Sequence, residues 1–221
     1  MPRTERVMFS GTAALCVRVP RETGLRALFA ARRAATLLAK HRVRLAVLPE
    51  DYPYFDAFLH RGIRPPDVAR LHRVCAAQIA LYVLRERGVA AENATVALVS
   101  EHICGELHAA AYTLARTVRY LTLRTPDADT LALALRREYG VAPRIVREGE
   151  TLRADAALSF DAAAEGCIDL SDRCPAAYSA EIGGAVCNDT ALLAALLAAG
   201  ALKTEQIRLE RFILPVAANF S

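Results

Sequence analysis

The sequence predicts an α/β protein whose larger part is a doubly wound, mostly parallel sheet. Short apolar segments alternate with amphipathic helical segments along most of the chain, which is the order that parallel strands with crossover helices require. The run Thr95–Val99, with the sequence TVALV, is apolar without interruption, as in strands that are buried on both faces. At 221 residues the chain is long enough for one large domain or two small ones.

The first elements predict a small βαβ region at the N-terminus. We expect a strand over Leu15–Val19, a helix over Gly24–Lys40 and a second strand over Val43–Leu48. Segments of these lengths in this order are typical of two parallel strands that are joined by a right-handed crossover.

Charged residues mark one side of the first expected helix. Arg26, Arg33 and Lys40 recur every seven residues, so they share a polar stripe that faces solvent. The apolar residues that lie off this stripe are expected to face a core: Leu25, Leu28 and Phe29.

An aromatic loop and a long helix follow. The loop, Pro49–Pro66, contains aromatic residues in a short stretch from Tyr52 to Phe58. Such a loop can cover a pocket or form a partner surface, but its residues more often fold back as a small satellite core. A helix is expected over Asp67–Arg87, because its apolar residues form a wide face and Gly88 ends it.

Strands and helices alternate through the second half of the chain. The expected strands are Thr95–Val99, Arg119–Leu123, Arg144–Val146, Ala156–Phe160, Cys167–Leu170, Ala185–Cys187 and Ile207–Leu214. The expected helices are Cys104–Arg116, Pro126–Tyr139 and Thr190–Ala199, the last capped by Asp189 and closed by Gly200. We place a boundary at residues 88–92. It separates an N-terminal α/β region with its linking helix, residues 1–90, from a Rossmann-like domain, residues 91–221.

Composition and charge exclude several classes of partner. The net charge is +4, but the arginines are scattered among Glu and Asp, so we expect no nucleic-acid partner. The uncharged run Thr190–Leu202 has 13 residues. A membrane span needs about 20, so no membrane partner is expected. The N-terminus lacks a secretory apolar region, and the six cysteines form no Cys-x-x-Cys pair, which favours a reduced, cytoplasmic protein.

The turn after the strand Thr95–Val99 is the candidate nucleotide site. In dinucleotide-binding folds this turn carries G-x-G-x-x-G and directs a helix N-terminus at a pyrophosphate. Overlaying that pattern places Ser100, His102 and Gly105 on the three glycines, and only the last matches. A His side chain stands where backbone must approach phosphate, and Glu101 adds negative charge, as does Glu106 further on. We therefore predict a degenerate site, in which Gly105 serves to pack the helix closely against the strand.

The next strand ends in Leu123-Arg124-Thr125. A carboxylate at this place binds the ribose hydroxyls of NAD, whereas an Arg can pair with the 2′-phosphate of NADP. The candidate cofactor-binding residues are therefore Ser100, His102, Gly105, Arg124 and Thr125, and the cofactor is NADP or none.

On these residues, the segment 91–202 resembles the NADP-binding domain of the shikimate dehydrogenase and glutamyl-tRNA reductase group. Those families place Asn-Arg-Thr after this strand; Arg124-Thr125 matches its last two residues and Leu123 replaces the Asn. The stretch Thr190–Ala201 is similar to their Thr-Pro-Leu-Leu helix region. The resemblance implies a Rossmann domain behind a small α/β domain, with NADP as cofactor. The resemblance does not extend to the family's Ser-x-Ser motif, which is absent from this sequence. The family's Asn-Ala-Thr loop is replaced here by Ser159–Ala162.

Two groups of residues invite a metal-site interpretation. Cys104 and His108 lie four residues apart and share a helix face, and His102 precedes them, but a fourth ligand is missing. We favour ordinary packing roles and predict no metal. The later cysteines also match no zinc spacing and are expected to be buried thiols: Cys167, Cys174 and Cys187.

Three carboxylates lie near the ends of expected strands: Asp161, Asp169 and Asp172. Side chains at this edge of a parallel sheet can orient a polar ligand or act as a base. Asp also caps turns, and we favour that role here.

No catalytic set is evident, so the catalytic residues stay unknown. Lys40 lies on the polar stripe, and Lys203 follows the last helix; His60 and Asp161 remain as proton donors that no spacing connects. We predict a non-catalytic ligand-sensing or interaction module with a degenerate dinucleotide site. The alternative is an NADP-dependent oxidoreductase of shikimate-dehydrogenase-like architecture. A small molecule is the expected ligand, and self-association into a homo-oligomer stays open.

Overall fold

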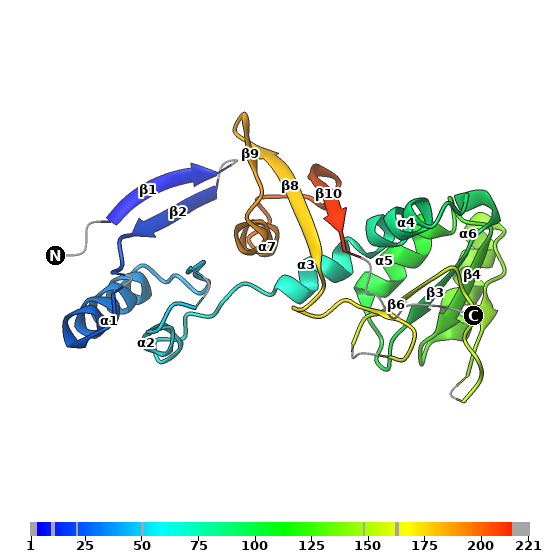
Figure 1. The fold of residues 1–221 in the computed structure, drawn as a ribbon, viewed down its shortest axis with the longest axis horizontal. Coiled ribbons are helices and arrows are strands. Elements are labelled where there is room, and N and C mark those ends of the chain that lie inside the picture. Colours follow the sequence, from blue (N-terminus) through cyan, green and yellow to red (C-terminus); the bar gives the residue numbers. More distant parts are fainter. Residues whose placement is uncertain are drawn as a thin grey trace. The chain divides into compact units, whose positions relative to one another are not determined.

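The computed structural model describes residues 4–9, 12–20, 22–49, 51–147, 149–161 and 164–213. Figure 1 labels most of the helices and strands. In chain order they are β1 (Thr4–Phe9), β2 (Thr12–Val17), α1 (Leu25–Lys40), α2 (Asp56–Leu59), α3 (Val68–Val74), α4 (Ala76–Glu86), β3 (Thr95–Val99), α5 (Gly105–Leu114), β4 (Tyr120–Arg124), α6 (Ala128–Tyr139), β5 (Arg144–Ile145), β6 (Ala156–Ser159), β7 (Ile168–Asp169), β8 (Ala176–Ile182), β9 (Ala185–Cys187), α7 (Thr190–Ala198) and β10 (Ile207–Phe212). No helix within these residues is long and apolar enough to span a membrane.

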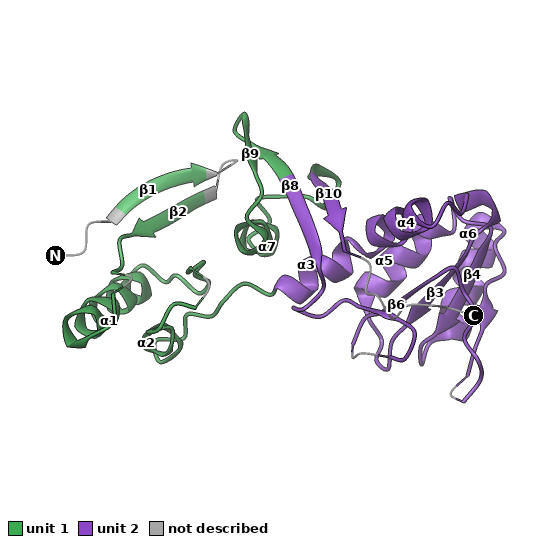
Figure 2. Ribbon diagram, in the orientation of Figure 1, with its two compact units in different colours: residues 1–67, 180–206 green, residues 68–179, 207–221 purple. Residues whose placement is uncertain are grey.

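The chain divides into two compact units, which Figure 2 colours separately. Unit 1 comprises residues 1–67 and 180–206, and unit 2 comprises residues 68–179 and 207–221. This division differs from the boundary expected at residues 88–92. Helices α3 and α4 lie before that boundary but belong to unit 2, because apolar residues of α4 such as Ile79 and Val83 are buried in the same core as the parallel sheet.

Unit 2 contains a five-stranded parallel sheet in the order β5-β4-β3-β6-β7. Strands β4 and β5 follow β3 in the chain and lie on one side of it. The chain then crosses to the other side of β3, where it forms β6 and β7. This reversal between β3 and β6 is the doubly wound, Rossmann-like topology. The predicted α/β class and the mostly parallel Rossmann-like sheet are confirmed.

One face of this sheet forms the main core. Alternate residues of its strands, among them Leu98, Leu123 and Leu158, are fully buried with apolar residues of α4, α5 and α6. Because successive strand residues point to opposite faces, Ala97, Thr122 and Ala157 belong to the other face, where the register brings them side by side. That face is buried too and is made of smaller side chains.

Unit 1 begins with an antiparallel hairpin, in which β1 pairs with β2 from Thr4↔Val17 to Phe9↔Thr12. The predicted βαβ arrangement in this region is therefore wrong in detail. The expected strand Val43–Leu48 forms only an isolated bridge between Leu45 and Arg64. The reason is that β2 finds its partner in the preceding segment, TERVMF, whose mixed polar and apolar residues give only a weak strand pattern.

Helix α1 buries a different face from the one expected. The polar stripe is confirmed, because Arg26, Arg33 and Lys40 are all exposed. However, Leu25 is 75% exposed and Phe29 is 56% exposed, so neither faces a core. The buried side is made mainly of small residues, which allow the helix to pack closely: Ala27, Ala31, Ala34, Ala35 and Leu38.

The aromatic loop of unit 1 folds into a satellite core, the more common of the outcomes expected for such a loop. Tyr52 packs edge-on against both Tyr54 and Phe58, with ring centroids 6.1 Å apart in each pair. Phe58, on α2, is fully buried in the same cluster as the small residues of α1. These aromatic side chains therefore supply apolar contacts between α1, α2 and the loop that joins them.

Two further elements differ from those expected from the sequence. The single helix expected over Asp67–Arg87 is divided at Cys75 into α3 and α4. The sequence also did not predict β8, which lies between β10 and β9 in a three-stranded sheet. Its segment, AAYSAEI, contains few β-branched residues, so propensity alone gives little sign of a strand.

Candidate functional site

A pocket of about 870 Å³ lies in unit 2 at the carboxyl ends of the parallel strands. Its lining includes residues that end or follow each of four strands: Ser100 after β3, Arg124 at the end of β4, Arg147 after β5 and Asp161 after β6. In open α/β sheets, ligands bind outside the carboxyl ends of strands at the point where the strand order reverses. Here that point lies between β3 and β6, so the pocket is in the expected place.

The strand register explains how the sequence brings these residues together. Val99 pairs with Arg124 on one side and with Ser159 on the other, so these three side chains lie in a row on one face of the sheet. All three line the pocket. Ser100 and Asp161 continue β3 and β6 by one and two residues beyond this row, and therefore meet at the crevice between those strands.

Asp161 binds the turn between β3 and α5. Its Oδ2 atom accepts a hydrogen bond from the Ser100 hydroxyl at 2.6 Å, and from the backbone amides of Glu101 and of His102, the latter at 3.2 Å. The His102 imidazole Nδ1 lies 3.6 Å from the same oxygen. The carboxylate thus occupies the place toward which the donors of this turn converge.

The ionisation of Asp161 agrees with this role. Burial of the carboxyl raises its pKa, but the hydrogen bonds from Ser100 and from the two amides outweigh burial, so the pKa of Asp161 is lower than its ordinary value. Hydrogen bonds to the charged form have this effect because protonation would weaken them. Asp161 is therefore an anion at neutral pH and a poor proton donor.

The turn does not fit the pyrophosphate of a dinucleotide. In Rossmann proteins, backbone amides at this turn bind the pyrophosphate. Here the amides of Glu101 and His102 already donate to a carboxylate of the same chain. A phosphate would have to displace Asp161 against the charge of Glu101, which also lines the pocket.

The remaining residues predicted for this turn have different positions. The His102 side chain is 79% exposed, and neither His102 nor Gly105 lines the pocket. Gly105 is the first residue of α5, and a Cβ atom built there would meet no atom within 4 Å. The idea that this glycine serves close packing of helix on strand is therefore wrong: the space beside it is open.

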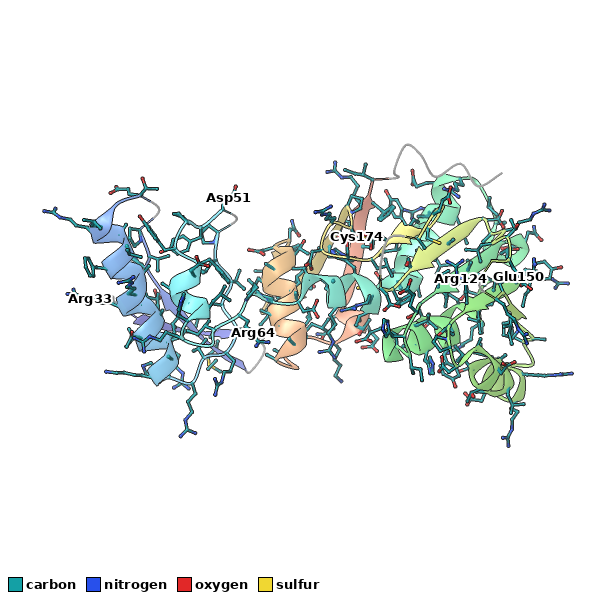
Figure 3. The ribbon with its side chains drawn as sticks, turned by 90° about the horizontal axis from the view of Figure 1, so that it is seen from below. Arg33, Asp51, Arg64, Arg124, Glu150 and Cys174 are labelled. Atoms are coloured by element: carbon teal, nitrogen blue, oxygen red, sulfur yellow. The ribbon has the colours of Figure 1, made fainter. Side chains whose placement is uncertain are left out.

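The pocket lining also includes two arginines, together with the carboxylate of Asp129. These arginines are Arg124 (labelled in Figure 3) and Arg147, and within the described part of the chain neither guanidinium group has a carboxylate partner. Thr125 also lines the pocket, with its hydroxyl donating to Asp127 at 3.0 Å. The sequence analysis did not predict Arg147 as a pocket residue. It follows β5 much as Arg124 ends β4, so the rule that ligands bind at strand ends could have indicated it.

The three residues of the metal hypothesis turn to three different partners. His108 Nε2 lies 2.6 Å from Asp127 Oδ2, Cys104 Sγ donates to Glu106 at 3.4 Å, and His102 faces Asp161. Among the described residues, no group of three or more His, Cys, Asp or Glu side chains is arranged to hold a metal ion.

The other carboxylates and cysteines have structural positions. Asp169 accepts hydrogen bonds from the amide and hydroxyl of Ser171, and Asp172 accepts one from the amide of Ala69 at 2.9 Å. Asp169 thus has the turn-capping role favoured from the sequence, whereas Asp172 binds the start of α3, 103 positions away in the chain. Cys174 is buried, which raises the pKa of its thiol to about 12. All six cysteines are free thiols.

One buried polar pair had no signal in the sequence. His72 on α3 and Tyr178 on β8 are each 1% exposed, and His72 Nδ1 lies 2.8 Å from the Tyr178 hydroxyl. Burial lowers the pKa of His72, although nearby Asp172 opposes the effect. The two residues lie 106 positions apart in the chain, and no local pattern could reveal their partnership.

The fold and the pocket together define a Rossmann-like α/β protein with a pocket at the switch point of its sheet. No protein-family model matches the chain, and no curated protein is significantly similar to it. One solved structure to which the chain is similar is L-tryptophan dehydrogenase from Nostoc punctiforme, with a TM-score of 0.33 and 11% sequence identity. The likeness covers 67% of this chain and 44% of that one, so the chain spans less than half of that protein. A likeness of this size says nothing about activity, and the fold assignment depends on the sheet itself.

Proposed function

We propose that this protein is a non-catalytic ligand-sensing or interaction module that binds a small anionic molecule in the pocket of unit 2. The observation that carries the proposal is the presence in that pocket of two arginines that form no ion pair within the described residues. Arg124 and Arg147 offer guanidinium groups that have no carboxylate partner among the described residues, while Asp161 fills the turn that would otherwise hold phosphate. A volume of about 870 Å³ suits a ligand of nucleotide size.

The arginines indicate the chemistry of the ligand. A guanidinium group binds carboxylate or phosphate through two parallel hydrogen bonds, and an Arg at the end of the second Rossmann strand can bind the 2′-phosphate of NADP. The resemblance of Arg124-Thr125 to the shikimate dehydrogenase group supports the same interpretation. Between the two arginines, Ile145 and Val146 offer apolar surface to a planar or aliphatic part of the ligand.

The residues that could donate a proton to a bound ligand support a non-catalytic role. Asp161 lines the pocket, but it is held as an anion by its hydrogen bonds. The only lysines, Lys40 and Lys203, are exposed and are not among the residues that line the pocket. Carbonyl reduction requires a proton donor beside the carbonyl, and none of these groups serves. We keep the cytoplasm as the expected compartment, with no nucleic-acid or membrane partner.

The alternative is an NADP-dependent oxidoreductase, and Arg124 is the observation that favours it. Titration of purified protein with NADPH and with NADH, followed by nicotinamide fluorescence, separates the two proposals. We expect at most weak binding, with NADPH preferred over NADH, and no NADPH oxidation above background with shikimate-type keto acids. Robust turnover would establish the oxidoreductase instead.

Two variants test the assignment of Arg124. Arg124→Asp places a negative charge in the pocket and should abolish any preference for phosphorylated nucleotides. Arg153→Asp is the matched control, because Arg153 is exposed and lies outside the pocket lining. Equal affinity of the unmodified protein for NADPH and NADH, or equal loss in both variants, would refute a role for Arg124 in ligand recognition.

A further inference from the structure

The donors of the β3–α5 turn are arranged around a single point. The Ser100 hydroxyl and the amides of Glu101 and His102 all donate to one oxygen of Asp161, and the His102 ring lies 3.6 Å from that atom. Donors from three consecutive residues converge in this way on anions bound at the start of a helix. In this protein the anion belongs to the chain itself and comes from a residue 61 positions after Ser100.

We propose that the Asp161 carboxylate is the resident anion of this turn and that it determines which ligands the pocket accepts. Ligands that require a phosphate at the turn, such as dinucleotides and nucleoside diphosphates, are excluded. Ligands whose anionic group lies at Arg124 and Arg147 are admitted. The ligand class is thus a small molecule with a single anionic group, such as a nucleoside monophosphate, and this second part rests on the proposed function.

Charge and hydrogen bonding both support the exclusion. A hydrogen-bond donor that is committed to a carboxylate must give it up before it can bind phosphate, and separating a charged acceptor from its donors is costly. Glu101 and Asp161 would also face an incoming phosphate with like charge in the same pocket. Arg124 and Arg147 line the same pocket, and neither forms an ion pair with a carboxylate among the residues that the structure describes.

The exclusion can be tested without knowing the physiological ligand. Inorganic pyrophosphate is added at neutral pH to ¹⁵N-labelled full-length protein, and the amide signals of Glu101 and His102 are followed by NMR. In the unmodified protein we expect these two signals not to move. In Asp161→Ala we expect both to show saturable shifts, because the donors are then free. Saturable shifts in the unmodified protein, or none in Asp161→Ala, would overturn the proposal.

Asp129→Ala provides the matched control. Asp129 also lines the pocket, but it lies in the first turn of α6. Its removal lowers the negative charge of the pocket by the same amount and leaves the turn donors committed. We expect no response of Glu101 and His102 to pyrophosphate in this variant. A response equal to that of Asp161→Ala would show that net charge, and not occupation of the turn, governs anion binding.

A second variant covers the case in which Asp161→Ala does not fold. Asp161→Asn keeps the shape and an acceptor oxygen but loses the charge. We expect the Glu101 and His102 amide signals to move upfield on substitution, because the acceptor is weaker, and still to ignore pyrophosphate because the place is filled. Unchanged amide signals in Asp161→Asn would mean that the carboxylate does not hold the turn, contrary to the proposal.

The ligand class is tested separately by calorimetric titration with adenosine 2′-monophosphate and with 2′-phospho-ADP-ribose, which adds a diphosphate. We expect the unmodified protein to bind the diphosphate compound no more tightly than the monophosphate, and Asp161→Ala to bind the diphosphate compound at least tenfold more tightly than the monophosphate. A large preference for the diphosphate in the unmodified protein would contradict the exclusion. If neither compound binds the unmodified protein, the proposed function fails for adenine nucleotides, while the NMR experiment still decides the role of Asp161.

Discussion

Ser100 and Asp161 connect the two halves of the doubly wound sheet. The Ser100 hydroxyl, directly after β3, lies 2.6 Å from Asp161 Oδ2, two residues after β6, although 61 positions separate them in the sequence. The oxygen of the same hydroxyl accepts a hydrogen bond from the backbone amide of His102 at 3.3 Å, so one side chain both shapes the turn and spans the crevice. This contact stabilises the native state as well as limiting access to the turn.

Ser100→Ala should therefore destabilise unit 2. Ser100 is 4% exposed, and its removal leaves a partly buried carboxylate oxygen with one donor fewer. We expect a loss of about 1–2 kcal/mol in the free energy of unfolding by urea. Thr113→Ala, at an exposed position of α5, is the control and should change stability by about 0.5 kcal/mol or less. Equal effects of both substitutions would mean that the Ser100 contact contributes nothing.

The buried pair of His72 and Tyr178 predicts a pH dependence of stability. Burial lowers the pKa of His72 from its ordinary value of 6.5, so the unfolded chain takes up this proton at a higher pH than the native protein. The stabilisation is complete above pH 6.5 and is lost as the pH falls from 6.5 through the lowered native pKa. In His72→Gln, the free energy of unfolding should decrease less steeply as the pH is lowered through this window. His41→Gln, at an exposed position, should keep the original slope.

The satellite core of unit 1 permits a paired test of two tyrosines. The buried Tyr52 hydroxyl has no hydrogen-bond partner within the described residues, so Tyr52→Phe should leave stability unchanged or raise it by up to about 1 kcal/mol. The Tyr54 hydroxyl, in contrast, donates to the Gly24 carbonyl oxygen at 3.0 Å and accepts from its amide. Tyr54→Phe should cost about 1 kcal/mol. Thermal unfolding of both variants measures the difference, and the opposite order would contradict these contacts.

The contact between His108 of α5 and Asp127 at the start of α6 gives a further prediction. Asp127 holds both His108 and the Thr125 hydroxyl, and it lies at the positive end of α6. Asp127→Ala should destabilise the protein by about 1–2 kcal/mol, since it removes two hydrogen bonds and a favourable charge. His108→Ala removes only one of these contacts and should cost less. A greater loss in His108→Ala, measured by denaturant unfolding, would indicate that His108 has contacts beyond Asp127.

The parallel sheet was the most predictable part of the molecule. Thr95–Val99 was predicted with the bounds that the structure shows, because an uninterrupted apolar run this short is typical of a buried strand and too short for a buried helix. The end of α6 was equally predictable, because a glycine, Gly140, follows its last residue. In the structure Gly140 adopts φ 69°, a left-handed conformation that ends helices and favours glycine. In both places local chemistry and the overall fold agree.

The hairpin and the role of Asp161 could not be derived in the same way. The pairing of β1 with β2 depends on which neighbouring segment becomes the partner of β2. The apolar pattern of β1 is too weak to indicate this partner. Asp161 was recognised as a residue at a strand end, but its acceptance of donors from Ser100, Glu101 and His102 depends on the register of β3 with β6. Register is a tertiary property, and the spacing of residues along the chain does not contain it.

The unequal burial of the cysteines makes the protein suitable for selective labelling. Cys16, in the hairpin of unit 1, is exposed, whereas Cys75 and Cys174 of unit 2 are buried thiols whose pKa is raised by burial to about 12. Thiolates are the species that react with maleimides, so these two should be nearly inert in the native protein. A fluorophore or spin label added briefly at neutral pH should therefore attach at Cys16 well before Cys75 or Cys174, while Cys104, Cys167 and Cys187 are partly buried. It would report on unit 1 while ligand binding is followed independently in unit 2.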